Sequence, residues 1–330
     1  MLRIHLDEYE MLDGSHKTLV KQVGDGSIIS RFDKTPPPKK AEDIVCPHFL
    51  ELRWALGCPF KCAWCYLQGT MRLYLVKKRP TVKYVLDELR PYELYEEIRT
   101  HLKSLFWNKY PSTPEMLNTG ELADSLMYEH APMPFSKFII PLFETQDQYK
   151  VLFLTKAPYV ENLLEIESHR QTVMSFSLNA EPVAARWEKA PKVVKRIEAA
   201  KAVFDVGYET RIRIDPIVPY PEGEWIKHYQ RLIDNVFSKF TPARITLGSL
   251  RGLQSTINAA EDKSWVAYLT EQTKWGKRIP FQRRLEMFGA LIDYLEKQYD
   301  YTRVALCKEP VTMWESLGLD WRKCECNCIL

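Results

Sequence analysis

The feature of this 330-residue chain that most restricts its fold is a regular alternation of strand-like and helix-like segments. Short apolar runs alternate with longer amphipathic segments, several of which begin with a proline in the first turn, where it favours a helix. The predicted strands are residues 49–55, 115–118, 151–155, 173–178, 210–217 and 244–247, with a further candidate at 303–306. The predicted helices are residues 91–106, 134–144, 158–167, 182–206, 223–240 and 281–299. Strands separated by helices predict a parallel sheet with helices packed outside it, which is an α/β fold.

The same pattern divides the chain into three regions. Residues 1–45 are polar and irregular, and the three consecutive prolines at 36–38 exclude a helix or a central strand there. We predict an N-terminal extension of short strands and turns. Residues 46–250 carry the alternation, and residues 251–330 form a helical C-terminal region that ends in a cysteine-rich tail.

The composition, with 45% hydrophobic and 27% charged residues, is ordinary for a soluble globular protein. No apolar run approaches the roughly 20 residues that cross a bilayer, and the first residues lack the apolar core of a secretion signal. We therefore expect a cytoplasmic protein without a membrane partner. The net charge of +3 neither indicates nor excludes a nucleic-acid partner. A basic cluster within residues 274–284 is either a solvated helix start or a phosphate-contacting patch.

A loop with three cysteines follows the first strand of the alternation, where parallel α/β proteins collect their chemistry. It begins at Gly57 and reads Gly-Cys-Pro-Phe-Lys-Cys-Ala-Trp-Cys-Tyr. Cys58, Cys62 and Cys65 can bind three irons of one [4Fe–4S] cluster and leave the fourth iron without a protein ligand. That iron can chelate the amino and carboxylate groups of S-adenosylmethionine (SAM). Reduction of the sulfonium then breaks a carbon–sulfur bond and makes a carbon radical.

The loop also has an alternative interpretation. A zinc site could combine these thiols with His48 or Cys46 as a fourth ligand. A two-residue gap between cysteines suits zinc, whereas the three-residue gap before it is less usual. The aromatic Trp64 before the third cysteine favours the cluster.

The loop makes the chain similar to radical SAM enzymes, and its ending in Cys-Tyr-Leu-Gln resembles the spore photoproduct lyase family. Further short stretches resemble this family along most of residues 46–300. The resemblance implies a partial (β/α)6 barrel over residues 46–250 that holds a [4Fe–4S] cluster on Cys58, Cys62 and Cys65. It also implies SAM as a cofactor and an external electron donor of the flavodoxin or ferredoxin type.

The ends of the predicted strands carry the residues that the resemblance assigns to SAM. Thr119, Gly120 and Glu121 resemble a motif that hydrogen-bonds the methionine amino group, and their alternative is a helix start with a favourable acidic residue. After the third strand, Lys156 resembles a lysine that contacts SAM. The other members of the expected cofactor-binding set are Trp64, Ser175, Ser177, Asn179, Arg213 and Asp215. Arg213 and Asp215 lie on one face of the fifth strand, where they either line the SAM or substrate pocket or form a structural ion pair.

The chain departs from the family in two places. The family has a cysteine after its second strand that returns a hydrogen atom to the product radical, whereas residues 117–125 contain no cysteine here. Trp64 stands where the family has a tyrosine, while Tyr66, which we expect to be catalytic, is retained. The resemblance therefore indicates the cofactor chemistry better than the substrate.

The C-terminal tail carries Cys324, Cys326 and Cys328 at alternate positions, with Cys307 upstream as a fourth candidate ligand. Alternate side chains of an extended segment project to the same side, so the three thiols could meet one soft ion or one substrate atom. The interpretations are a second iron–sulfur cluster, a zinc or thiophilic substrate site, a redox or hydrogen-donating thiol set, and a frayed tail. We predict that the tail cysteines act together at the catalytic site.

The leading functional hypothesis is a radical SAM enzyme, similar to spore photoproduct lyase, that makes a carbon radical acting on a substrate, which is either a nucleic acid or a small molecule. The first alternative is a biosynthetic radical SAM enzyme whose substrate is a small molecule, such as a thiophilic compound held by the tail. The second alternative is a non-catalytic metal-binding module, which zinc without iron would favour.

Overall fold

The computed structural model describes residues 1–70, 91–108 and 113–330 of the chain. One ten-stranded sheet runs through it in the order β1-β2-β3-β4-β5-β6-β7-β8-β9-β13, so the sheet is open and has β1 and β13 at its edges. The strands are Ile4–Glu10 (β1), His16–Val23 (β2), Ile29–Phe32 (β3), Phe49–Leu52 (β4), Glu115–Asn118 (β5), Tyr149–Thr155 (β6), Thr172–Leu178 (β7), Glu209–Ile217 (β8), Ile245–Ser249 (β9) and Val304–Leu306 (β13).

From β4 to β13 every neighbouring pair in the sheet is parallel, which confirms the predicted α/β arrangement and the strand at its end. All seven residues of β7 are buried, as a central parallel strand requires. The predicted strand at 49–55 ends early, at Leu52, because the chain turns there and the Trp54 N–H donates to the Leu52 carbonyl.

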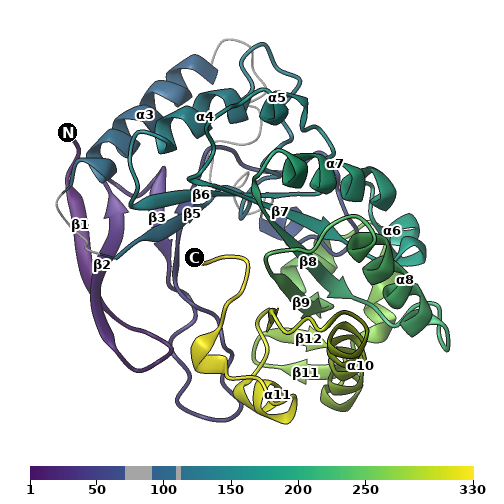
Figure 1. Cartoon of the computed structure of the whole chain (residues 1–330). Helices are drawn as coiled ribbons and strands as arrows, with labels where there is room; N and C mark the ends of the chain where they lie inside the picture. Colours follow the sequence, from purple (N-terminus) through teal and green to yellow (C-terminus); the bar gives the residue numbers. More distant parts are fainter. Residues whose placement is uncertain (71–90, 109–112) are drawn as a thin grey trace.

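The helices cover the outer side of the sheet, with α3 and α4 near β5 and β6 and with α6 to α8 near β7 and β8 (Figure 1). Their bounds are Pro91–Phe106 (α3), Phe135–Phe143 (α4), Glu161–Leu164 (α5), Glu181–Trp187 (α6), Val193–Asp205 (α7), Trp225–Phe237 (α8), Gln254–Ala259 (α9), Phe281–Tyr299 (α10) and Val311–Ser316 (α11). Short 3₁₀ helices span Ser264–Tyr268 and Trp321–Lys323.

Two predicted helices are wrong in extent. The helix expected over 182–206 is split into α6 and α7, because Glu188 is extended and Pro191 interrupts the hydrogen-bond ladder. The helix expected over 158–167 is reduced to the four residues of α5. Near the end of α5, the Tyr208 hydroxyl donates a hydrogen bond to the carbonyl of Leu163.

The N-terminal and C-terminal regions both contribute further strands. β1, β2 and β3 are antiparallel and join the main sheet through the pairing of β3 with β4. A second sheet of three short strands consists of Arg251–Gly252 (β10), Glu271–Thr273 (β11) and Gly276–Arg278 (β12). Among the described helices, none combines the length and apolarity that a bilayer-spanning segment needs.

Candidate active site

The three-cysteine loop lies at the C-terminal end of the parallel strands, beside the loop that follows β5. Gly57 connects the two loops, because its N–H donates to the Leu122 carbonyl at 2.7 Å and its backbone pairs with Ala123. Gly57 has φ 100°, a conformation that glycine adopts without steric cost. This backbone pairing brings the cysteines next to the predicted SAM motif.

The three thiols of the loop share a largely buried environment. Cys62 is buried, while Cys58 and Cys65 are half-buried. Burial raises the pKa of all three thiols, to about 12 for Cys62, because the thiolate is costly in a poorly solvated site. Lys156 opposes this effect at Cys62 and Cys65. Thiolates at this position therefore need a strong cationic partner, which a bound metal centre supplies.

The described side chains around the loop form no site for a single metal ion. Within residues 1–70, 91–108 and 113–330, no three His, Cys, Asp or Glu side chains surround one point closely enough to bind a single ion. A [4Fe–4S] cluster has a different requirement, since each cysteine binds a different iron. His48 lies near the Thr35 carbonyl and the Cys46 thiol contacts the Pro47 carbonyl, so neither completes a zinc site with the loop.

The segment after β5 places Glu121 against the cysteine loop. The Tyr66 hydroxyl donates to the backbone carbonyl of Glu121. Burial raises the pKa of the Glu121 carboxyl, and the positive charges of Lys308 and Arg213 oppose the increase. A Cβ atom at Gly120 would lie 2.5 Å from the Cβ of Leu154, so only glycine fits there. This close approach holds the predicted motif against the end of β6.

Lys156 follows β6 and belongs to a buried ion triad. Its Nζ lies 2.7 Å from Oε1 of Glu188, and Nη1 of Arg196 lies 2.7 Å from Oε2 of the same carboxylate. The side chain of Glu188 is 0% exposed, whereas that of Lys156 is 17% exposed. Lys156 is thus the member of the triad that can also reach a ligand, and Glu188 orients it.

The polar residues predicted on β7 have mixed surroundings. The Ser175 hydroxyl accepts a hydrogen bond from the Asn327 side chain at 2.8 Å. Asn179 is buried, where its carbonyl accepts from Tyr229 and its amide donates to Pro216. Ser177 is 8% exposed. Their predicted contact with SAM stays a prediction.

The charged residues predicted on β8 form an ion cluster with Arg251. Both Arg213 and Arg251 lie 2.8 Å from Oδ2 of Asp215. Burial opposes ionisation of Asp215, but the two guanidinium groups prevail and hold its pKa below the usual range. Gly248 accommodates this carboxylate, since a Cβ there would lie 2.4 Å from Cγ of Asp215. An ion pair is therefore present, and a role toward SAM or substrate stays a prediction.

The C-terminal tail runs along the inner side of the sheet, where Figure 1 shows it in yellow with the strands around it. Asn327 is 0% exposed, and its side chain bonds to Ser175, Thr246 and the Ile212 carbonyl. Leu330 packs against a small apolar cluster of β5, β6 and β7. The tail is therefore a packed element of the interior, and the frayed-tail interpretation is wrong.

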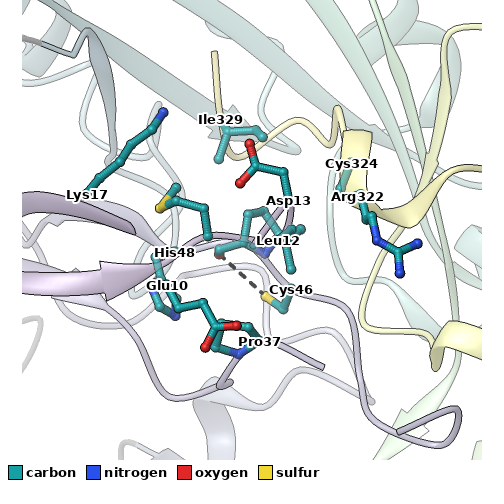
Figure 2. A pocket seen from close by; sticks show the side chains of 12 residues that line it. Glu10, Leu12, Asp13, Lys17, Pro37, Cys46, His48, Arg322, Cys324 and Ile329 are labelled. Carbon is teal, nitrogen blue, oxygen red and sulfur yellow. Dashed lines mark hydrogen bonds between the residues drawn. The ribbon is translucent and has the colours of Figure 1, made fainter. Parts of the chain in front are cut away.

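The tail cysteines are spread along this element. Cys328 and Cys307 both lie beside Arg213, whereas Cys324 lines a cavity of about 130 Å³. Figure 2 shows this cavity between residues of the β1–β2 hairpin, the segment around Cys46 and the tail. The cavity contains none of the three loop cysteines. The tail thiols thus line two different places, and the predicted second metal site has no single-ion geometry among the described side chains.

Three buried polar residues of the site were not predicted from the sequence. Asp124 accepts hydrogen bonds from Thr155 and from the backbone of Lys156, while Glu188 and Asn327 act as described above. A buried carboxylate looks like any surface carboxylate in a sequence. The sequence pointed only to Asp124, which comes three residues after the predicted SAM motif at the end of β5.

Comparisons with known proteins agree with this arrangement. A family model described as "Spore photoproduct lyase" matches residues 48–247. The spore photoproduct lyase of Bacillus subtilis is 27% identical over 235 residues, which are 70% of this chain and 59% of that protein. That of Clostridium acetobutylicum is 23% identical over 184 residues, 56% of this chain and 50% of that protein. The chain thus spans between half and three-fifths of these relatives.

Solved structures show the same fold. "Spore photoproduct lyase complexed with dinucleoside spore photoproduct" has a TM-score of 0.61 at 18% identity, covering 83% of this chain and 78% of that one. A mutant "with bound AdoMet and dinucleoside spore photoproduct" has a TM-score of 0.60 at 18% identity, with the same coverage. The α/β prediction is thereby confirmed, with a sheet that is open.

Proposed function

The chain belongs to the spore photoproduct lyase family, and on this premise we propose that it is a radical SAM enzyme. The observation that carries the proposal is the position of Cys58, Cys62 and Cys65 at the C-terminal end of the parallel strands, beside Glu121 and Lys156. When bound, a [4Fe–4S] cluster with SAM at its open iron supplies an electron that breaks a carbon–sulfur bond and yields a carbon radical.

The chain's own residues bind and orient SAM. Lys156 offers an ammonium group to the methionine carboxylate, and Glu188 fixes its direction from the other side. Glu121 offers a carboxylate to the methionine ammonium group. Gly120 keeps the β5 loop close to β6, so that both groups approach one ligand from neighbouring strand ends.

The cofactor proposal is tested by replacing Cys58, Cys62 and Cys65 together with alanine. After anaerobic reconstitution, the variant should lose roughly four irons and four sulfides per chain and make no 5′-deoxyadenosine from SAM. Cys46→Ala is the matched control, since it removes one half-buried thiol outside the loop and should retain both the iron and the SAM cleavage. Equal iron content and equal SAM cleavage in the triple variant would refute the assignment, and zinc in place of iron would favour the non-catalytic module.

For the substrate, we propose a dimeric photoproduct in DNA, the kind of lesion named in the relatives' structures. Trp275 at the tip of the β11–β12 hairpin is 49% exposed, and Lys274 and Lys277 beside it are exposed. An exposed aromatic ring flanked by lysines can stack on a base and contact phosphates. Arg278 and Arg284, by contrast, are buried with Glu309, so the predicted basic cluster contributes only in part.

A binding and turnover assay tests this substrate. An oligonucleotide that contains spore photoproduct should bind and be repaired with SAM, and Trp275→Ala should weaken binding by about 1–3 kcal/mol. Trp107→Ala, which removes another exposed indole, is the control. Unchanged binding in Trp275→Ala would show that the hairpin does not contact the DNA. Absence of repair would refute the proposed substrate.

A small-molecule substrate is the second candidate, and one observation favours it. Residues 117–125 offer no thiol, while Cys307 and Cys328 lie on the inner side of the sheet beside Arg213. Radical cleavage of SAM without repair of the oligonucleotide would favour this candidate. A second metal site on the tail cysteines also stays a proposal, and iron above four per chain would support it.

Three finer points complete the proposal. We propose that the six strands β4 to β9 with their helices form a partial (β/α)6 barrel, which their parallel pairing supports. A flavodoxin or ferredoxin supplies the reducing electron, which a reduction assay with each purified donor tests. The protein acts in the cytoplasm, where these donors occur.

A further inference from the structure

Two thiols near the C-terminus, those of Cys307 and Cys328, lie beside one guanidinium group, that of Arg213. The Nη1 of Arg213 donates to the Cys328 sulfur at 3.6 Å, and its Nη2 donates to the Cys307 sulfur at 2.9 Å. Two cysteines from separate segments are thus brought together at one guanidinium group.

Cys307 and Cys328 belong to two separate elements. Cys307 follows β13, and its N–H donates to the Leu247 carbonyl of β9 at 2.7 Å, so its backbone belongs to the sheet. Cys328 belongs to the tail, beside the fully buried Asn327. The two sulfurs accept from the two terminal nitrogens of one planar fork, which holds them on the same side of β8.

Exposure distinguishes this pair from the other tail thiols. Cys307 and Cys328 are half-buried, whereas Cys324 and Cys326 are buried. A small oxidant therefore reaches the pair beside Arg213 first. Arg213 also lowers the cost of the thiolate at both sulfurs, but the pKa of each thiol stays above its ordinary value. The causes are burial at Cys307, and the neighbouring Cys326 thiol together with burial at Cys328. Thiolate formation at either cysteine begins thiol–disulfide exchange.

We propose that Cys307 and Cys328 are a redox-modification site that forms a reversible disulfide and fixes the tail inside the sheet. The oxidant is a low-molecular-weight disulfide such as oxidised glutathione. Its S–S bond breaks, the S–S bond between Cys307 and Cys328 forms, and the two protein thiols pass two electrons and two protons to give two molecules of reduced glutathione.

The site goes beyond the proposed function and is independent of it. The bond closes the chain between β13 and the tail, so the oxidised tail cannot leave the inner side of the sheet. The reduced tail is held by non-covalent contacts, chiefly those of Asn327 and of Arg244, whose Nη1 donates to the carbonyls of Ile329 and Leu330. The redox state of the pair thus controls how readily the interior opens.

Peptide mapping of the full-length protein tests the proposal. The protein is treated anaerobically with oxidised glutathione, the remaining thiols are alkylated, and linked peptides are identified without reduction. We expect a Cys307–Cys328 linkage, a Tm rise on the order of 5 °C and at least tenfold slower release of Leu330 by carboxypeptidase. Dithiothreitol should reverse all three changes.

Single serine variants provide the controls. Cys307→Ser and Cys328→Ser should each abolish the linkage and the Tm rise, while Cys46→Ser, which removes a thiol that contacts the Pro47 carbonyl instead, should retain both. Circular dichroism checks that each variant is folded. Alkylation mapping of the wild-type protein tests for the Cys307–Cys328 disulfide directly, even if a variant does not fold. Linkage of other cysteines, glutathione adducts without a protein disulfide, or no oxidation would each overturn the proposal.

Discussion

Replacing Glu188 with glutamine should destabilise the protein through the ion triad behind the candidate SAM site. The carboxylate lies 2.7 Å from Lys156 and 2.7 Å from Arg196, and it is 0% exposed. Glutamine keeps the shape of the side chain but removes the charge. Two cations then remain close together without their shared anion, in a region that water enters only at Lys156.

The magnitude follows from two independent estimates. Burial opposes ionisation of Glu188, but Lys156 and Arg196 prevail and lower its pKa to about 2, compared with an ordinary value of 4.5. Since a tenfold change in proton affinity is worth about 1.4 kcal/mol, the triad contributes about 3 kcal/mol to the free energy of unfolding. Breaking one buried ion pair typically costs about 3–5 kcal/mol. The lower figure applies because Arg196 keeps the carbonyls of Pro191 and Ser177 as partners.

Thermal unfolding followed by circular dichroism measures this effect. A loss of about 3 kcal/mol should lower the Tm of Glu188→Gln by about 6 °C at pH 7. Because the folded pKa is lower than the unfolded one, the stabilisation is complete above about pH 4.5 and is lost as the pH falls toward 2. The Tm gap between wild type and variant should therefore shrink when the pH is lowered from 5 to 3.

An exposed ion pair supplies the matched control. Glu261 lies 3.3 Å from Lys189, and both side chains are more than half exposed, at 80% and 67%. Glu261→Gln should therefore change the Tm by no more than about 1 °C, since exposed pairs contribute little. If Glu188→Gln behaves like this control at pH 7, or if its Tm gap is independent of pH between 5 and 3, the reasoning about the triad is refuted.

Two further variants probe the tail and the SAM motif. Asn327→Ala removes the side-chain hydrogen bonds to Ser175, Thr246 and the Ile212 carbonyl. It should lower the free energy of unfolding in urea by about 2–4 kcal/mol. A loss below about 0.5 kcal/mol would show that the tail does not stabilise the fold. Glu121→Ala should weaken SAM binding by about 1–3 kcal/mol in calorimetry, because a charge-assisted hydrogen bond is lost; equal affinity would reject that role.

The sequence alone determined the local features of the fold and the cluster loop. The strand 115–118 and the helices 91–106 and 281–299 were predicted with their final bounds, because their apolar pattern and their flanking residues act within a few positions. The three-cysteine loop was predicted for the same reason. Its spacing is a local property, and its place after a parallel strand follows from the alternation.

Only the tertiary structure decided which distant segments meet. The tail bonds to Ser175 and Ile212, which lie 152 and 115 positions away from Asn327, and Lys156 meets Glu188 across 32 positions. No periodicity or spacing encodes such contacts, because they depend on how whole strands are ordered in the sheet. Hydrogen bonds and ion pairs between buried groups are strong only where the fold excludes water. The surroundings of Asn327 and Glu188 therefore became visible only in the folded chain.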